Sequence, residues 1–180
     1  MPDLPLAGGT SDTAATAWCA LSGAALPHVP LGYDIDLPGP VGERNRYRLG
    51  AAGTVLALAE TRAGLIEQIA WALATGNRVV LADAAPVADL IARLPDGLLA
   101  RIETPRDWRH AGPFARALVT GSPPFVRAAL GNLAALPGPI VTAEMPCAGG
   151  GYAPAMLLRE TTISINTTAA GGNASLMALA

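Results

Sequence analysis

The stretch TVLALAETRAGLIEQIAWALATGNRVVLA, residues 54–82, holds two short apolar segments on either side of an amphipathic one. Residues 54–59 and 78–82 have the length and composition of buried strands. Between them, residues 62–75 carry apolar side chains at helical spacing, at Leu65, Ile69 and Leu73. Gly76 stands where this helix should end, because glycine readily adopts the left-handed conformation of helix ends. The stretch therefore predicts a strand–helix–strand unit with parallel strands.

The same alternation continues toward the C-terminus. A helix is expected to begin at Pro86 and to end before Pro95, and Ser122 is expected to cap another that has two prolines in its first turn. Further strands are expected at residues 98–102, 115–120 and 139–143. Strands that alternate with helices predict a Rossmann-like, doubly wound α/β fold with a mainly parallel sheet of about five strands.

The flanking segments complete the expected organisation. A helix is predicted at residues 12–26 with Trp18, Leu21 and Ala25 on one face, and a turn-rich connector at residues 37–47. Glycines and prolines interrupt the pattern after Ala143, and extended structure resumes at residues 157–165. We therefore expect an N-terminal lead and helix at 1–32, the α/β domain at 33–144, a protruding β-flap at 145–165 and an extended C-terminal docking tail at 166–180.

The composition narrows the classes of function. Of the 180 residues, 51% are hydrophobic and 14% charged, which predicts that another chain or domain covers part of the surface. The last twenty residues carry no charge at all, so they do not resemble a solvated disordered arm, and we expect them to dock onto a protein surface. The net charge of −2 argues against nucleic acid as a partner. All twelve cations are arginine, so no lysine can form a Schiff base or serve a phosphate-binding loop.

Neither a targeting segment nor a membrane span is expected. The N-terminus lacks the basic start and apolar core of a secretory signal, and prolines and glycines interrupt every apolar run before it could cross a bilayer. Cys19 and Cys147 are far apart and fit no metal-ligand spacing, so we expect two reduced thiols in a cytoplasmic protein.

No catalytic, cofactor-binding or metal-binding residue is predicted from local motifs. The sequence AETRAG follows the first strand in place of a glycine-rich dinucleotide motif, and residues 149–151 (GGG) indicate a flap hinge. His28 and His110 have no nucleophile or carboxylate partner in sequence and are expected at the surface. Cys147 is either a nucleophile or a thiol that is buried or inert. Glu144 is either a site residue just past a strand end or an ordinary polar loop residue.

Three segments together resemble the cofactor-binding domain of the aldehyde dehydrogenase superfamily. Residues 72–81 (ALATGNRVVL) resemble its helix–Gly-Asn–strand segment, residues 119–122 (VTGS) its Phe-Thr-Gly-Ser turn, and residues 140–145 (IVTAEM) the strand that ends in its general-base glutamate. The family's lysine and glutamate for the cofactor ribose are replaced by residues 82–85 (ADAA), and two prolines follow the turn. The resemblance implies a dehydrogenase fold with a decayed cofactor site and without the family's catalytic domain.

Two further segments resemble the C-terminal region of the long forms of proline utilization A (PutA). They are residues 37–45 (LPGPVGERN) and 164–177 (SINTTAAGGNASLM). The resemblance implies a parent with an FAD-dependent proline dehydrogenase and an NAD-dependent glutamate-semialdehyde dehydrogenase module. It implies that this segment itself binds no cofactor and is not an enzyme. Its flap and tail would pack against the aldehyde dehydrogenase module of the same or a neighbouring polypeptide and seal the tunnel between the two active sites.

An uncharged extended tail suits the addition of a strand to an exposed sheet edge. The docking residues that we expect are Ile163, Ile165, Asn166, Gly171, Gly172, Asn173, Leu176 and Met177. Two other functions stay open at this point. One is a stand-alone NAD(P)-binding or reductase domain with Glu144 and Cys147 in its site, and the other is a self-associating domain that forms a homodimer through the flap and tail.

Overall fold

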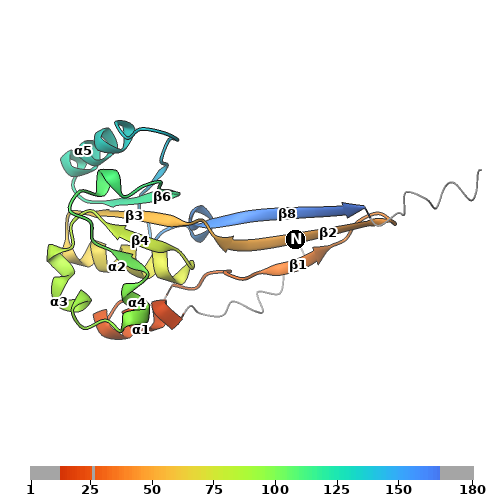
Figure 1. Cartoon of the computed structure of the whole chain (residues 1–180), viewed down its shortest axis with the longest axis horizontal. Helices are drawn as coiled ribbons and strands as arrows, with labels where there is room; N and C mark the ends of the chain where they lie inside the picture. The colour runs from red at the N-terminus through yellow and green to blue at the C-terminus, as the bar shows by residue number, and fades with distance from the viewer. Residues whose placement is uncertain (1–12, 26, 167–180) are drawn as a thin grey trace, which may run out of the picture.

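The computed structural model describes residues 13–25 and 27–166. An α/β body occupies one end of the molecule, and a long, narrow β-ribbon projects from it (Figure 1). The predicted tail residues Gly171, Gly172, Asn173, Leu176 and Met177 lie outside the described residues. Among the described residues, no helix has both the length and the apolar character needed to cross a membrane.

A five-stranded parallel sheet forms the centre of the body, as the alternating sequence pattern predicts. Its order is β5-β4-β3-β6-β7, and every neighbouring pair is parallel. The strands are β3 (Thr54–Ala59), β4 (Arg78–Leu81), β5 (Ile102–Glu103), β6 (Arg116–Thr120) and β7 (Ala143–Glu144). The chain builds outward from β3 to β5 and then returns to place β6 on the other side of β3, so the sheet is doubly wound.

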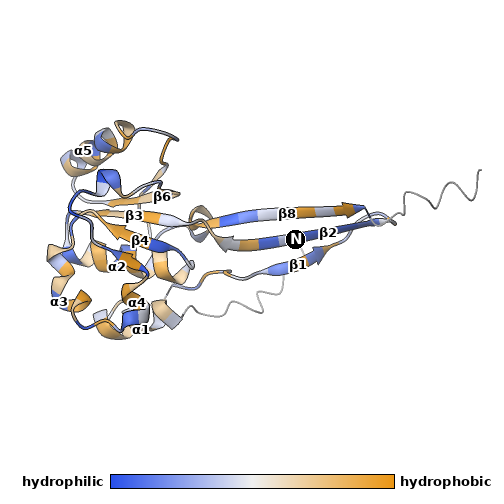
Figure 2. Cartoon of the chain, viewed as in Figure 1, coloured by the Kyte–Doolittle hydropathy of each residue, from blue (hydrophilic) through white to orange (hydrophobic). Residues whose placement is uncertain are grey.

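Alternate side chains of the central strands serve two separate cores. Val55 and Ala57 of β3 pack with α1 (Thr13–Ser22) and α2 (Arg62–Ala74), whereas Leu56 and Leu58 face α5 (Pro123–Ala134). Both sets are buried, which explains the continuous apolar run in this strand. Figure 2 shows the contrast between these apolar strands and the largely hydrophilic ribbon. The α/β class and the helices on both faces of the sheet confirm the predicted fold.

The termini of α2 follow the chemistry of its sequence. The Thr61 hydroxyl accepts a hydrogen bond from the Gly64 amide at 3.1 Å, which caps the first turn. At the other end, Gly76 has a φ of +76° and donates from its amide to the Leu73 carbonyl. Gly76 therefore ends the helix as predicted.

Several weaker elements differ from the sequence-based expectation. The helix expected after Pro86 is broken into short pieces, and the expected strand at 98–102 shrinks to β5 because Pro95 starts another helical turn through Leu98. The last strand, expected at 139–143, is reduced to β7, and Ile140 is 97% exposed. The short helical elements are η1 (Ala85–Val87), α3 (Ala88–Ile91), α4 (Asp96–Leu99) and η2 (Trp108–His110).

The N-terminal helix is shorter than predicted. α1 ends at Ser22 because Gly23 adopts a φ of +75°. Trp18 is fully buried against α2, and its Nε1 donates to the Ile66 carbonyl at 3.0 Å. Ala25, expected on the same apolar face, lies beyond the helix and is exposed.

The projecting ribbon is a three-stranded antiparallel sheet, which we call the flap. It consists of β1 (Asp34–Leu37), β2 (Glu43–Ala51) and β8 (Leu158–Asn166), in the order β1-β2-β8. The expected connector at 37–47 is therefore mostly a β-hairpin, in which β2 also pairs with β8 along all nine residues of each strand. The sequence predicted the extended structure of β8 but not its partners.

Asn77 joins the flap to the body. Its side chain has no exposed surface. The Oδ1 atom accepts from the Gly53 amide at 2.7 Å, between β2 and β3, and Nδ2 donates to the Leu157 carbonyl at 2.8 Å, where η3 (Pro154–Leu157) leads into β8. One buried amide therefore fixes two of the three chain crossings between body and flap, and the third precedes β1.

Candidate functional site

The direction of chain winding reverses between β3 and β6. In open α/β sheets, ligands bind outside the carboxyl ends of the strands at such a switch point. β3 ends at Ala59 and β6 ends at Thr120, and α2 and α5 begin just beyond them. A nucleotide held by this domain would lie beyond these strand ends, beside the first turns of α2 and α5. We call this region the crevice.

A carboxylate of the chain itself lies at the start of α5. Glu60 Oε2 accepts from the Ser122 amide at 2.6 Å, and Oε1 accepts from the Ser122 hydroxyl at 2.9 Å. The first two helical residues, Pro123 and Pro124, have no N–H group to donate. Helix starts bind phosphate through such N–H groups. Here the Ser122 amide is already bonded to an anion, and the next two donors are absent.

Gly121 permits this close contact. A Cβ atom at Gly121 would lie 2.6 Å from Phe125 Cδ1 and 2.9 Å from Glu60 Cβ. The turn between β6 and α5 is thus packed directly against the side chain that follows β3. The glycine of the VTGS turn serves the packing of the chain on itself.

On the α2 side, the crevice contains a buried polar cluster. Gln68 Nε2 donates to the Leu58 carbonyl and to the Tyr152 hydroxyl, each at 3.1 Å, and to Thr120 Oγ1 at 3.3 Å. The Tyr152 and Thr120 hydroxyls also share a hydrogen bond. Burial raises the pKa of the Tyr152 phenol, so its hydroxyl stays protonated at neutral pH. The side chains of the chain itself thus fill this part of the switch point.

The loop after β7 delivers Tyr152 into the crevice. The Gly151 amide donates to Glu67 Oε1 at 3.0 Å, and the Tyr152 ring meets Trp71 edge-on at a centroid distance of 6.3 Å. Gly151 has a φ of +71°, and a Cβ there would lie 2.8 Å from Trp71. The last glycine of the predicted hinge therefore lies against α2 and holds the loop on the body.

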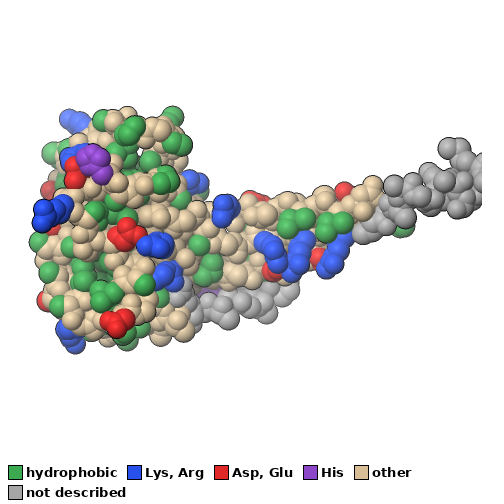
Figure 3. Space-filling model, viewed as in Figure 1, with side chains coloured by type: hydrophobic (Ala, Val, Ile, Leu, Met, Phe, Trp, Pro, Cys, Tyr) green, Lys and Arg blue, Asp and Glu red, His purple; other side chains and the backbone are tan. Residues whose placement is uncertain are grey.

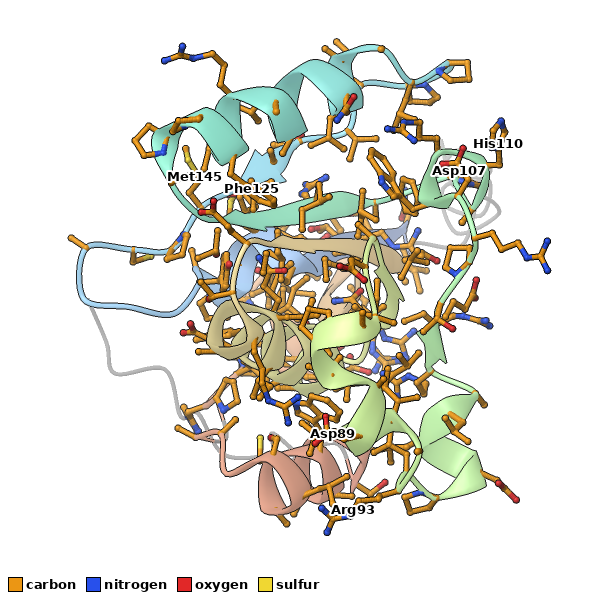
Figure 4. All side chains as sticks on the ribbon, turned by 90° about the vertical axis from the view of Figure 1, so that its left-hand side faces the viewer. Asp89, Arg93, Asp107, His110, Phe125 and Met145 are labelled. Carbon is orange, nitrogen blue, oxygen red and sulfur yellow. The ribbon has the colours of Figure 1, made fainter. Side chains whose placement is uncertain are left out.

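The candidate catalytic side chains do not form one site. His28 and His110 are exposed as predicted, and Figure 4 shows His110 beside Asp107, on the other side of the domain from Phe125 and Met145. His110 Nδ1 lies 3.3 Å from Asp107 Oδ2, so the expectation that it has no carboxylate partner was wrong. Cys147 is exposed, which excludes a buried thiol and leaves the inert one. The residues in the described ranges include no group of three or more His, Cys, Asp or Glu side chains arranged to bind a metal ion.

Glu144 and Cys19 occupy more sheltered positions. Glu144 lies within β7 and not in a loop, and its Oε1 atom is buried without a hydrogen-bond partner in the described structure. Cys19 is buried in α1, and this burial raises the pKa of its thiol. A raised pKa keeps the Cys19 thiol protonated and unreactive.

The flap brings together the described docking candidates. Ile163 and Ile165 lie on one face of β8, 37% and 48% exposed, and Asn166 is the last residue of the strand. β8 is the terminal strand of the flap sheet, with β2 on one side and no other described strand on its outer edge. An edge of nine residues is long enough to accept a further strand.

Ion pairs cover the neighbouring part of the same face. Arg44 binds Asp36 through two hydrogen bonds, Arg46 binds Asp34 likewise, and Arg48 Nε lies 2.9 Å from Asp34. Figure 3 shows these arginines in a row beside hydrophobic side chains of the flap. The hydrogen bonds to arginine lower the pKa of both aspartates, so these carboxyls stay ionised across the physiological range.

Sequence reasoning missed the residues that fill the crevice. In the sequence, Glu60 is only one residue of the stretch AETRAG that replaces a glycine-rich motif, although its place in the first strand-to-helix turn is a usable signal. Gln68 looks like any polar residue on an amphipathic helix, and Tyr152 lies in a loop without a pattern. Their positions depend on contacts between residues 84 positions apart.

Comparison with known proteins shows the family to which the chain belongs. The bifunctional protein PutA of Rhizobium meliloti is 44% identical over 155 residues, and the match covers 83% of this chain and 13% of that protein. The bifunctional protein PutA of Salmonella typhimurium strain LT2 is 36% identical over 145 residues, or 79% of the chain and 11% of the relative. The chain is a homologue of a segment of PutA. No model of a protein family matches it.

The solved structures agree with the fold. A structure of PutA with proline bound in remote sites superposes with a TM-score of 0.52 at 24% identity, over 74% of this chain and 15% of that one. This likeness shows a shared architecture, and the sequence relatives show membership in the PutA family. The chain spans about an eighth or less of the length of the curated PutA relatives named above.

Proposed function

We propose that this chain is a non-catalytic domain of a PutA-type proline catabolic enzyme, in which it docks onto the aldehyde dehydrogenase module. The observation that carries the proposal is the outer edge of β8, which extends along nine residues at the end of a projecting sheet. Main-chain groups on such an edge can bind a strand of another module. Ile163 and Ile165 would then be covered by that partner, with Asn166 and the tail residues continuing the contact.

The contact between Glu60 and Ser122 at the switch point supports the proposal that the domain is non-catalytic. A dinucleotide phosphate at the start of α5 would compete with the Glu60 carboxylate for the Ser122 donors. The phosphate and the carboxylate would both approach the Ser122 donors, and two negative groups so close together repel each other. The segment is therefore proposed to bind neither NAD nor FAD.

In this role the domain would assist catalysis by covering a passage between two active sites. A reactive semialdehyde made in one module would reach the other without release into bulk water. The flap and tail would form part of the wall of that passage. The domain would contribute binding surface and no reacting group.

The test is the coupled reaction in the PutA enzyme that contains this chain. Deletion of residues 166–180 should lengthen the lag before NADH appears when proline is the substrate, or lower both activities. Each activity should also be measured with its own substrate added directly. Unchanged coupled kinetics after the deletion would exclude the docking role.

The alternative is an NAD(P)-dependent domain that uses Glu144 and Cys147. The buried, unpartnered Oε1 of Glu144 is the observation in its favour, because such atoms occur at functional sites. Calorimetric titration of the 180-residue chain with millimolar NAD separates the two functions. Saturable binding would favour the alternative, and its absence is expected for a docking domain.

A further inference from the structure

The two faces of the flap differ in charge. Strand register places Arg159 on the same face as the three arginines of β2 and the two aspartates of β1, so this face has four arginines against two aspartates. The opposite face carries Glu43 and Glu160 and no arginine from these strands. The flap therefore has an arginine face and an acidic face.

The arginine face is hollowed at the base of the flap. Gly50 lies between Arg48 along β2 and Arg159 across on β8, and nothing lies within 4 Å of the place where a Cβ would project. A hollow of about 320 Å³ lies here, and Gly50 is part of its lining. Arg48, Arg159, Thr161, Tyr33 and Asp34 are among the residues that line it.

The positive charge around the hollow exceeds what the chain supplies to balance it. Asp34 is the one carboxylate in the lining, and Arg46 already binds it through both oxygens at 2.6 and 2.7 Å. Arg48 reaches the same carboxylate through Nε alone, at 2.9 Å. Arg159, which is exposed on the next strand, adds a second guanidinium to the lining. One more anion in the hollow would pair with the guanidinium groups of Arg48 and Arg159.

We propose that the hollow over Gly50 binds the carboxylate of an aspartate or glutamate side chain from a partner strand paired with the outer edge of β8. A partner residue opposite Arg159 or Thr161 would have its Cβ atom about 5 Å from theirs and about 10 Å from Gly50. A glutamate or aspartate side chain and the Arg159 guanidinium together can span that gap. Guanidinium groups bind carboxylates through charge-assisted, often paired hydrogen bonds. The Thr161 hydroxyl offers an additional donor.

The hollow gives the docked strand a defined position. Main-chain pairing along β8 is nearly independent of sequence, and a slip by one residue would place the partner's side chains on the other face. An acidic residue near the base of the flap would hold one register, because the arginine face attracts it and the acidic face repels it. This inference rests on the proposed docking role and names the chemistry of the partner strand.

The site can be tested on the isolated chain with succinate as a carboxylate probe. Titration into the ¹⁵N-labelled 180-residue chain should shift the amide signals of Gly50 and Thr161 in a saturable way. Arg159→Gln should weaken this binding about tenfold or more, the usual effect of losing a charge-assisted hydrogen bond. Arg127→Gln, an exposed arginine on α5, serves as the matched control and should leave it unchanged.

A second variant blocks the hollow without disturbing the fold. Gly50→Val adds a side chain where the backbone has no positive φ and no neighbour within 4 Å, and valine suits a strand. It should abolish the succinate shifts while the remaining amide spectrum stays native. Absence of saturable shifts in the unmodified chain, equal shifts in Gly50→Val, or inorganic phosphate binding more than tenfold tighter than succinate would each overturn the proposal.

The same variant in the PutA enzyme separates this proposal from the docking role. Gly50→Val should lengthen the lag in coupled NADH formation, whereas Arg127→Gln should not. If deletion of residues 166–180 impairs coupling and Gly50→Val does not, docking stands and the carboxylate site is wrong. If succinate binds as expected and the deletion has no effect, the site stands and docking is wrong.

Discussion

Asn77 shows how much one buried side chain can organise. Its side-chain amide bonds to Gly53 at one crossing into the flap and to Leu157 at another, and its own backbone carbonyl accepts from Arg101 Nη2 at 2.7 Å. Asn77 has no solvent exposure, so bulk water does not satisfy these groups in its place. The orientation of the flap therefore depends on the residue after the helix-ending glycine.

Asn77→Ala is expected to lower the free energy of unfolding by about 2–4 kcal/mol, because the Gly53 amide and the Leu157 carbonyl would each lose a buried partner. Urea denaturation followed by circular dichroism measures the change. Asn132→Ala, at an exposed position on α5, is the matched control and should stay within about 0.5 kcal/mol of the unmodified chain. Equal effects of the two substitutions would contradict the anchoring role.

Two glycines should respond to alanine in opposite directions. Gly151→Ala introduces a side chain at a φ of +71° and only 2.8 Å from Trp71, so it should destabilise the fold by about 1–3 kcal/mol. Gly131→Ala, in an open position within α5, should stabilise it by about 0.5–1 kcal/mol. Thermal unfolding monitored by tryptophan fluorescence compares them. A neutral Gly151→Ala would show that the loop is not held against α2.

For single residues, the sequence predicts a structural role when that role depends on residues nearby in the chain. Gly76 was predictable because a helix end needs a left-handed residue. The function of Asn77, one position later, was not predictable, since its partners lie 24 and 80 residues away. The same holds for the contact between Glu60 and Ser122, which joins two loops 62 residues apart.

Among the elements, the flap strands β1 and β2 depend most on ionised side chains. Arginine lowers the pKa of Asp34 and Asp36 in the folded chain below the ordinary value of 3.8. A lowered folded pKa means that the ion pairs stabilise the flap above about pH 4 and that this contribution is lost as the pH falls below it. The body has such pairs too, since the hydrogen bond from Arg62 lowers the pKa of Asp89. Its sheet is held mainly by apolar packing, however, so the loss of protection should be largest in the flap.

Amide hydrogen exchange at pH 5 and at pH 3 tests this expectation. Exchange in β1 and β2, corrected for intrinsic rates, should become faster at the lower pH, while protection in β3 and β6 persists. Asp34→Asn should reduce the difference between the two pH values, and Asp96→Asn, outside the flap, should not. Uniform loss of protection across both sheets would refute a local effect.

Predictability of the elements followed the strength of their local pattern. The bounds of β3, α2, β4 and β6 and the start of α5 were predicted to within about two residues, because apolar periodicity and end signals coincide there. β5 and β7 hold two residues each, too few to show a pattern, and the prolines near them shifted their boundaries. The hairpin of β1 and β2 was missed because charged residues occupy every second position of both strands, between Asp34 and Arg48. Such a polar stretch is typical of a connector, and only the pairing of the two strands shows that it is a hairpin.

For the molecule as a whole, the uncovered flap edge predicts self-association. When no partner covers β8, two copies should pair through this edge at high concentration. Ile163→Lys places a charge on the exposed face of the edge strand and should keep the chain monomeric. Light scattering at two concentrations measures this, with Ile140→Lys, on the exposed loop before β7, as the control. Equal dimerisation of both variants would assign the contact to another surface.

The attachment of the flap has a consequence for how such a domain can change over time. β2 runs into β3 through two residues, so the flap leaves from the amino ends of the parallel strands, whereas the crevice at Glu60 lies at their carboxyl ends (Figure 1). Substitutions at one end do not touch the other. Selection could therefore relax on a cofactor pocket while continuing to act on a docking ribbon, and a domain could survive the loss of its own chemistry by remaining useful to a neighbour.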